Sequence, residues 1–264
     1  MELPLIMNDV LYDLQGGVFK ITLNRIDKHN AFDDKLLAEL LRLLEQAETN
    51  ASVRCVVLNA NGKHFSAGAD LSWMKRMAEF NEEENIRDAT VLANLMHALY
   101  RNPKPTIAVV QGAAFGGGAG LVAACDIAIA AENATFCFSE VKLGLIPAVI
   151  SPYVVNAVGA RVATWLFTSA EVVNATRAYE LGLVHYCLPI QSLDSFSMSF
   201  AETLTKNAPK AVEDAKKLVH FVQDKPITQA LIKETALLIA KKRISEEGQC
   251  GLNAFLNKKT PIWD

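Results

Sequence analysis

The sequence predicts an α/β fold with a helical C-terminal subdomain. Predicted strands alternate with predicted helices up to about residue 190, and only helical patterns follow. Residues 53–74 and 106–125 share one order: an apolar strand, then small residues with glycine, then a helical pattern. The length of 264 residues and the hydrophobic content of 51% suit one large domain, or one domain with an appended subdomain. We place the boundary between residues 1–192 and residues 193–264.

The alternation begins with two strands, residues 10–14 and 18–23, joined by a turn at Gly16 and Gly17. A charged loop over residues 24–30 leads into a helix whose apolar residues recur at helical spacing. These residues are Leu36, Leu37, Leu40, Leu41, Leu43 and Leu44.

An apolar run at residues 53–58 predicts a strand that is buried on both faces. A helical pattern at residues 77–100 ends at Pro103 and Pro105. The later predicted elements are a strand at 106–110, a helix at 119–125, a strand at 135–138, a helix at 175–181, a strand at 183–187, and helices from residue 193 to a polar tail at 257–264.

Charge and cysteine content exclude several classes of protein. The formal net charge is -3 at pH 7 and the basic residues are scattered, so we expect no nucleic-acid partner. The five cysteines show neither Cys-x-x-Cys nor zinc spacing, which predicts reduced thiols in a cytoplasmic compartment and no metal site. The first 14 residues lack a basic region, so we expect no signal peptide. No apolar run is long enough for a membrane span.

Three consecutive glycines, Gly116, Gly117 and Gly118, precede the predicted helix at residues 119–125. Without Cβ atoms, the backbone there can approach a ligand closely. A helix that begins at this point presents free N–H groups, which stabilise an oxyanion. The stretch is neither a P-loop nor a dinucleotide fingerprint, because the required spacing and the following Gly-Lys are absent. A plain tight turn is the alternative.

A second glycine loop, Ser66-Ala67-Gly68-Ala69-Asp70-Leu71, follows the strand at residues 53–58. If the two strands before the glycine loops are parallel neighbours, both loops emerge at the sheet edge where α/β proteins bind ligands. Two backbone N–H groups there could hold one carbonyl oxygen, with roughly 2.7–4 kcal/mol of transition-state stabilisation per donor. Glu140 follows another predicted strand and could bring a carboxylate to the same place. A solvated loop residue is the alternative for Glu140.

Five motifs occur in order along the chain: the loop from Asn24 to Ala31, F-S-A-G-A-D-L, the G-G-G helix start, S-E-V-K-L-G-L-I-P and A-F-L-x-K-x-x-P-x-W. Together they resemble the enoyl-CoA hydratase/isomerase family, or crotonase family, over nearly the whole chain. The resemblance implies a core with the ββα spiral superfold, a helical trimerisation subdomain and acyl-CoA thioester substrates. It also implies trimers or dimers of trimers, and no cofactor apart from the coenzyme A of the substrate.

The resemblance further implies site residues. Ala69 and Gly117 match the oxyanion amides, and Glu140 matches the residue that handles the proton at Cα. The matching substrate and CoA positions are Lys28, His29, Asn30, Ala67, Asp70, Leu71, Trp73, Gly116, Gly120, Phe255 and Lys258, the last pair reaching CoA on a neighbouring subunit. A phosphate partner would suit Lys28 and Lys258 as point charges, and a solvated lysine is the alternative for each.

The chain departs from the pattern at Gly120. Hydratases of the family usually carry a second glutamate there, and hydration needs both a base for water and an acid for Cα. Three interpretations follow: a hydratase with a differently held water, an isomerase that uses Glu140 as its sole base, or an acyl-CoA-binding protein with little catalysis. We favour the first, because the spelling of the motifs resembles the branch that acts on 3-methylglutaconyl-CoA in leucine degradation. The distal carboxylate of the 3-methylglutaconyl substrate would then help to orient water.

Several neighbouring residues have alternative roles. We expect Glu140 to lie among apolar side chains, which would raise its pKa. Asp70 is predicted to cap the helix that follows it. Trp73 lines the acyl pocket or packs in the core, and His64 is structural or solvated. Asp126 is predicted to accept hydrogen bonds at a helix end.

Overall fold

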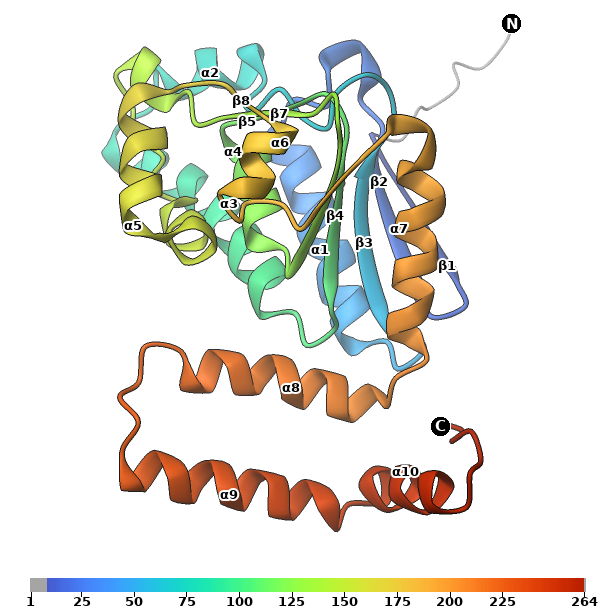
Figure 1. Cartoon of the computed structure of the whole chain (residues 1–264). Coiled ribbons are helices and arrows are strands. Elements are labelled where there is room, and N and C mark those ends of the chain that lie inside the picture. Colours follow the sequence, from blue (N-terminus) through green and yellow to red (C-terminus); the bar gives the residue numbers. More distant parts are fainter. Residues whose placement is uncertain (1–8, 264) are drawn as a thin grey trace, which may run out of the picture.

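The computed structural model describes residues 9–263 (Figure 1). Its main sheet has six strands in the order β1-β2-β3-β4-β6-β9, and β1 is antiparallel to β2 while the other pairs are parallel. The strands are β1 Val10–Gln15, β2 Val18–Leu23, β3 Cys55–Ala60, β4 Thr106–Val110, β6 Ile127–Ala131 and β9 Tyr186–Leu188. The predicted parallel pairing of the two strands before the glycine loops is therefore confirmed.

A second, small sheet in the order β5-β7-β8 lies at one end of the main sheet (Figure 1). It consists of β5 Ala113–Phe115, β7 Thr135–Cys137 and β8 Val173–Asn174. Glu140 follows this sheet in a 3-10 turn, η2 Glu140–Leu143, and an earlier turn, η1 Ile26–Lys28, follows β2. The small sheet thus brings the segment after Gly112 and the segment before Glu140 side by side.

Helices cover both faces of the main sheet (Figure 1). The first six along the chain are α1 Asp34–Thr49, α2 Leu71–Met77, α3 Glu82–Arg101, α4 Gly117–Ala124, α5 Ser151–Ser169 and α6 Ala175–Glu180. The last four are α7 Ile190–Thr205, α8 Pro209–Val222, α9 Gln229–Arg243 and α10 Glu246–Leu256. Among these, α8 to α10 extend below the sheet as an arm (Figure 1).

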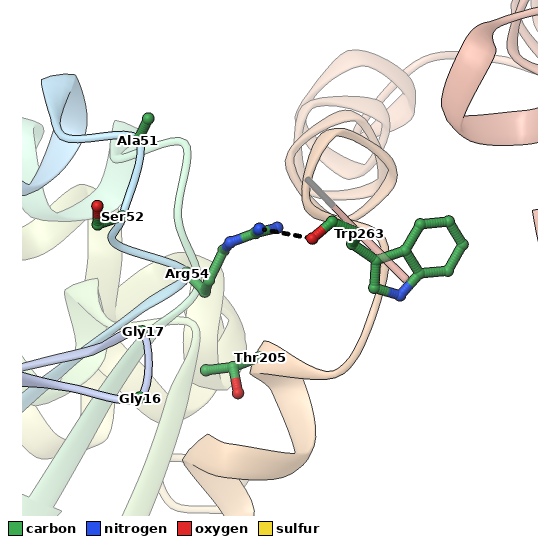
Figure 2. A pocket seen from close by; sticks show the side chains of 7 residues that line it. All are labelled: Gly16, Gly17, Ala51, Ser52, Arg54, Thr205 and Trp263. Carbon is green, nitrogen blue, oxygen red and sulfur yellow. Dashed lines mark hydrogen bonds between the residues drawn. The ribbon is translucent and has the colours of Figure 1, made fainter. Parts of the chain in front are cut away.

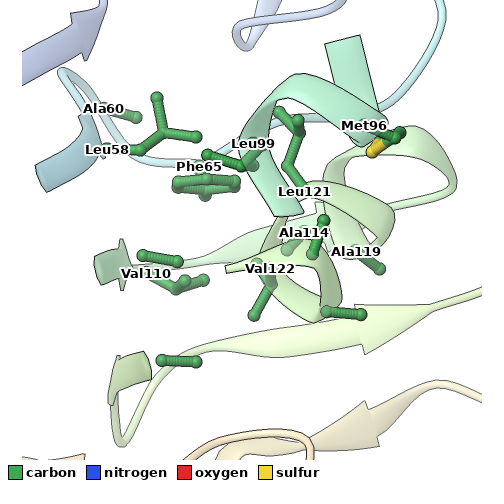
Figure 3. Close-up of a cluster of buried hydrophobic side chains, with 14 of the residues drawn as sticks. Leu58, Ala60, Phe65, Met96, Leu99, Val110, Ala114, Ala119, Leu121 and Val122 are labelled. Carbon is green, nitrogen blue, oxygen red and sulfur yellow. The ribbon is translucent and has the colours of Figure 1, made fainter. Parts of the chain in front are cut away.

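The larger hydrophobic core lies between one face of the sheet and α1, α3, α4 and α5. Figure 3 shows its centre, where Leu58 of β3, Leu99 of α3 and Leu121 of α4 meet around Phe65. All four side chains are buried. Because α4 is buried within this cluster, its N-terminus is held in one place, and that N-terminus carries Gly117.

A second core cluster on the other sheet face involves α7, where Leu193 and Ala201 pack on residues of β2, β3, β4 and β6. Helix α7 therefore belongs with the core, although the predicted boundary at residue 192 assigns it to the C-terminal subdomain. The change in packing comes after Thr205, where the arm begins. A role of the arm in trimerisation stays a prediction.

Other differences from the sequence predictions have local causes. The helix predicted at residues 77–100 is α3 and begins at Glu82, because Asn81 forms a capping box with Glu84 there; Met77 is the last residue of α2. Strands β5 and β6 are rich in alanine and were not predicted. The predicted strand at 183–187 is observed one to three residues later, as β9. The prediction that the N-terminus is not a signal peptide concerns residues that lie mostly outside the described range. Asp264, the last residue of the polar tail, also lies outside that range.

Candidate active site

The two glycine loops are joined to each other through their backbones. Ser66 N donates to Ala113 O at 2.9 Å, and Phe115 N donates to Ser66 O at 3.0 Å. A Cβ atom at Gly68 would lie 3.1 Å from Phe115 O, so the loops are in contact here. The structure therefore brings together the two stretches whose convergence the sequence predicts.

The orientation of the Ala69 N–H is set by a second backbone bridge. Phe32 N donates to Gly68 O at 2.7 Å, and Asp70 N donates to Phe32 O at 2.8 Å. Because the peptide unit is planar and trans, the Ala69 N–H points opposite to the Gly68 carbonyl, away from Phe32. Within residues 9–263 this N–H donates to no acceptor. It is a free donor beside the second glycine loop.

The Gly117 N–H is the first of α4. Groups in the first turn of a helix have no acceptor in that helix, and the dipole places partial positive charge there. Within the described chain the Gly117 N–H has no other acceptor. A Cβ atom at Gly117 would lie 3.3 Å from the Phe32 ring, so Phe32 contacts both candidate donor segments. Gly118 is needed for packing, since its Cβ would lie 2.9 Å from that of Ser66.

The carboxylate of Glu140 lies beside Gly116. Gly116 N donates to Cys137 O at 2.8 Å, which holds the glycine loop next to the end of β7. A Cβ atom at Gly116 would lie 3.4 Å from Glu140 Oε1, and Gly116 has a positive φ of 51° that favours glycine. Glu140 Oε2 is buried and has no hydrogen-bond partner within the described residues. Burial raises the pKa of this carboxyl, as expected from the sequence.

Asp70 caps α2 and anchors a cluster of charges. Its Oδ1 accepts from Ser72 N at 2.7 Å and from Trp73 N at 3.3 Å, and its Oδ2 lies 3.0 Å from Lys28 Nζ and 3.3 Å from Arg25 Nη2. Burial acts to raise the pKa of Asp70, but the hydrogen bonds and the two cations outweigh it and lower the pKa to about 2. The predicted capping role is confirmed, and Asp70 stays ionised at neutral pH.

The predicted CoA positions in the Lys28–Asn30 segment and in the second glycine loop lie close together. Ala67 N donates to His29 O at 3.0 Å, which joins the Lys28–Asn30 segment to the second glycine loop. Asn30 is only 1% exposed, and its amide donates to Asn61 O and His64 O. Asn30 therefore organises the loop from inside, and its predicted CoA contact stays a prediction, as do those of Lys28, His29 and Ala67.

Trp73 and His64 both have structural roles. Trp73 is buried in the main core cluster, and its Nε1 donates to Asp88 at 2.8 Å, so the packing alternative describes its position. His64 Nδ1 accepts from Ala113 N at 3.0 Å, which fixes the ring against the start of β5. Leu71 is exposed in the first turn of α2, and its predicted contact with substrate stays untested.

The place of the second glutamate in the family pattern is filled by apolar atoms. A Cβ atom at Gly120 would lie 2.3 Å from Ile150 Cγ2 and 3.2 Å from Met96 Cε. A side chain at residue 120 would therefore collide with Ile150 unless Ile150 moved. The departure at Gly120 is matched by its surroundings, because Ile150 occupies the space that a larger residue would need.

Comparison with known proteins gives the family. The family model described as "Enoyl-CoA hydratase/isomerase" matches residues 13–264. The chain belongs to the enoyl-CoA hydratase/isomerase family. A Legionella pneumophila structure, provisionally classed as an enoyl-CoA hydratase/isomerase (crotonase), is 59% identical; the match covers 98% of this chain and 100% of that one, with a TM-score of 0.95.

Two further relatives extend the comparison. The structure of an enoyl-CoA hydratase from Shewanella pealeana is 46% identical with a TM-score of 0.94, over 98% of this chain and 97% of that one. The 2,3-dehydroadipyl-CoA hydratase of Escherichia coli is 32% identical over 97% of this chain and 98% of its own length. The predicted crotonase-like fold is thereby confirmed.

Phe255 lies in α10, and Lys258 follows that helix. The arm that carries them lies away from β7, the strand that precedes Glu140 in the same chain (Figure 1). Phe255 is 80% exposed. A separate cavity of about 450 Å³ lies at the opposite end of the sheet from Glu140, and Figure 2 shows Arg54 reaching across it to the carbonyl oxygen of Trp263. Its lining residues are Gly16, Gly17, Ala51, Ser52, Arg54, Thr205 and Trp263. It is a different place from the candidate site, which the backbone amides and Glu140 define.

The described residues contain neither a candidate metal cluster nor a candidate membrane-spanning helix. Residues 9–263 contain no cluster of three or more histidine, cysteine, aspartate or glutamate side chains suited to a metal ion. In the same range no helix has the length and apolar character that crossing a membrane requires.

Four residues of the site have structural roles that the sequence does not predict: Arg25, Phe32, Ser66 and Ile150. Ser66 Oγ donates to Asn30 O at 2.8 Å and accepts from Gly68 N at 3.2 Å. Arg25 and Phe32 lie in a charged loop and at a helix start, where exposure is the usual expectation. Their roles depend on which loops the fold places against them, and no local pattern signals that.

We expect the stability cost of Glu140 to depend on pH. Because burial raises its pKa above 4.5, the folded state binds the proton more tightly than the unfolded state, so stability is lost as pH rises through the raised pKa. Glu140→Gln removes this titration. Urea unfolding over a pH series should show the variant gaining stability relative to the wild type as pH rises above about 4.5. A difference that is independent of pH would contradict the burial of the charge.

Proposed function

We propose that this protein is an enoyl-CoA hydratase that adds water across the 2,3-double bond of an acyl-CoA thioester, or removes it. One observation carries the proposal: the N–H groups of Ala69 and Gly117, on the two joined glycine loops, have no acceptor within residues 9–263, and Gly116 lies beside the carboxyl of Glu140, one oxygen of which is buried. Family membership supports acyl-CoA substrates. No cofactor is required, since coenzyme A is part of the substrate.

In the proposed mechanism, the amides of Ala69 and Gly117 bind the thioester oxygen. Negative charge grows on that oxygen as water adds at Cβ, and fixed donors in a site from which water is excluded stabilise such charge strongly. Glu140 gives a proton to Cα and, left as a carboxylate, takes up the proton that water loses as its oxygen bonds to Cβ. A raised pKa suits this step, because a carboxyl that titrates closer to neutral pH can both give and retake a proton.

The substrate class follows from what is missing at Gly120. With Ile150 in that space, the chain offers no carboxylate there to activate water. We propose a branched acyl group with its own distal carboxylate, such as the 3-methylglutaconyl group of leucine degradation, which would help to orient the water. A relative named for 2,3-dehydroadipyl-CoA supports an acyl group with a second carboxylate.

A second candidate function is Δ3,Δ2-enoyl-CoA isomerisation, and the packing at Gly120 favours it. Isomerisation needs one base, which takes a proton from one carbon and returns it to another. Glu140 alone could do this in an apolar pocket. The two functions share the oxyanion site and differ only in whether water reacts.

We predict that Glu140→Gln abolishes turnover while acyl-CoA binding persists, because the amide cannot exchange a proton and the two N–H donors are unchanged. Product analysis on crotonyl-CoA, 3-hexenoyl-CoA and 3-methylglutaconyl-CoA measures the wild-type activity. A hydroxyacyl product identifies a hydratase, and a preference for 3-methylglutaconyl-CoA supports the proposed substrate.

The same assays include the outcomes that contradict the proposal. A migrated double bond as the main product would replace hydration by isomerisation. Unreacted thioester with all three substrates would leave an acyl-CoA-binding protein with little catalysis. Unchanged turnover in Glu140→Gln would reject Glu140 as the catalytic residue.

We predict that Gly120→Glu alone gives little hydratase activity on crotonyl-CoA, because its Cβ collides with Ile150. The double variant Gly120→Glu/Ile150→Ala removes the nearest colliding atom, Ile150 Cγ2, and leaves Ile150 Cβ at 2.8 Å from the new Cβ, a contact that a small backbone shift must relieve. It should hydrate crotonyl-CoA at least tenfold faster than Ile150→Ala, on the scale of about 10²–10⁴-fold for general base catalysis. Equal rates for the double variant and Ile150→Ala would show that water activation is not what the native site lacks.

We also propose a homotrimer or a dimer of trimers in which the arm completes the CoA site of a neighbouring subunit. Apolar residues of α9, α10 and the tail are strongly exposed in the single chain, as expected for a surface that another chain covers. These residues are Leu237, Leu238, Ile239, Ile244, Phe255, Leu256 and Ile262. The five free cysteines of the chain support the proposed cytoplasmic location.

Mixed assemblies test this arrangement. We expect Lys258→Glu to raise KM, because it places a negative charge beside the phosphates of CoA, and Glu140→Gln to abolish kcat. Co-expression of the two variants should restore activity above the mean of the separate proteins, since some sites then combine Glu140 of one chain with Lys258 of another. Lys259→Glu is the matched control for Lys258. Activity no higher than the mean would place the whole site within one chain.

A further inference from the structure

We propose that Arg25 is a positioning residue for the reaction: its guanidinium clamps the Phe32–Ala69 backbone bridge and so holds the Ala69 N–H in the direction that the oxyanion site needs. This inference rests on the proposed role of Ala69. It assigns a function to a residue that does not touch the substrate.

Arg25 contacts both of the chain segments that the bridge joins. On the Phe32 side, its Nη1 donates to Ala31 O at 3.0 Å and its Nη2 lies 2.8 Å from Asp33 Oδ2. On the Ala69 side, Nη2 lies 3.3 Å from Asp70 Oδ2. One guanidinium thus reaches the residues immediately before and after Phe32, and the residue immediately after Ala69.

The peptide unit between Gly68 and Ala69 links this clamp to the reaction. Its carbonyl accepts from Phe32 N at 2.7 Å, and its N–H is the proposed donor to the substrate. Since the peptide is planar, any rotation of the Gly68 carbonyl turns the Ala69 N–H through the same angle. Gly68 has a φ of 95°, and glycine supplies little conformational restraint of its own. The direction of the N–H therefore depends on contacts from outside the loop.

Arg25 is better suited to this task than the other cation at the bridge. Its side chain is 10% exposed, whereas that of Lys28 is 42% exposed and is screened by water. A guanidinium is planar and offers five donors in a fixed fork, so it can bind Asp33, Asp70 and Ala31 O together. An ammonium offers a single point of charge. Arg25→Lys therefore keeps the charge and loses the clamp.

Asp70 is the partner through which the clamp acts on the glycine loop. Its Oδ1 is committed to two N–H groups of α2, so the carboxylate cannot turn toward another partner without uncapping that helix. In Asp70→Asn the amide oxygen can still cap α2, while the charge that faces Arg25 is removed. Both substitutions break the Arg25–Asp70 contact; Asp70→Asn also removes the Lys28–Asp70 ion pair, and Arg25→Lys also weakens the contacts with Ala31 O and Asp33.

The test compares Arg25→Lys, Asp70→Asn, the double variant and Arg42→Lys. Arg42 is the matched control, because it pairs with Glu39 on the exposed face of α1. Two quantities are measured: steady-state kinetics, and the absorption band of bound 2,4-hexadienoyl-CoA. Hydrogen bonds to the thioester oxygen move that band to longer wavelength, so the shift reports the oxyanion site without turnover.

We expect kcat of Arg25→Lys and Asp70→Asn to fall about 10- to 100-fold, the scale of a small misplacement of a catalytic group. KM should change less than about threefold, because the lost interaction belongs to the transition state. The red shift should shrink in both variants, and the double variant should lose little more than either single variant, since both act through one contact. Arg42→Lys should match the wild type. If Arg25→Lys does not fold, Asp70→Asn carries the same comparison.

Three outcomes would overturn the inference. A wild-type kcat and red shift in Arg25→Lys would show that the clamp is dispensable. Additive losses in the double variant would show that Arg25 does not act through Asp70. A wild-type protein that binds the dienoyl thioester without any red shift would instead reject the oxyanion role of Ala69, and the positioning role with it, whatever the variants do.

Discussion

The site depends on backbone hydrogen bonds between loops that follow different strands. One bridge joins Ser66 to the chain around Ala114, and a second joins Phe32 to the chain around Ala69. Together they hold three segments against one another at the end of the main sheet where the parallel strands terminate. The second bridge uses Gly68 O and Asp70 N, and leaves the N–H of Ala69 between them without an acceptor in the described residues. Ala69 is exposed, so a ligand can reach this donor.

Burial gives the carboxyl of Glu140 its chemical character. One of its oxygens has no partner in the described structure, and its pKa is raised by the loss of water around it. Asp70 lies in the second glycine loop and has the opposite character, because four donor groups surround its carboxylate and lower its pKa. The site thus separates an acid that can exchange protons from one that holds charge for structural reasons. The difference comes from hydrogen-bonding partners, since Asp70 is the more buried of the two residues and yet has the lowered pKa.

Much of the frame was accessible from the sequence. Continuous apolar runs identified β3 and β4, and the leucine spacing identified α1, since these patterns reflect burial on two faces or on one helical stripe. The glycine loops marked where side chains would obstruct close approach, and Asp70 was recognised as a cap. Short alanine-rich strands such as β5 and β6 were missed, because their strand character comes from neighbours in the sheet. The place of α7 was also misjudged, as a helical pattern does not say which surface it covers.

The chemistry available is written in the sequence: one carboxyl at Glu140 and glycines that expose backbone donors. Which of these groups meet depends on the tertiary structure. It placed Phe32 and Arg25 against a loop about forty residues away, and it filled the space above Gly120 with Ile150. The physical reason is that helical and strand patterns are local, whereas the contacts between loops depend on how the whole sheet is assembled. Residues whose roles are set by such contacts carry no signal in their own neighbourhood of the chain.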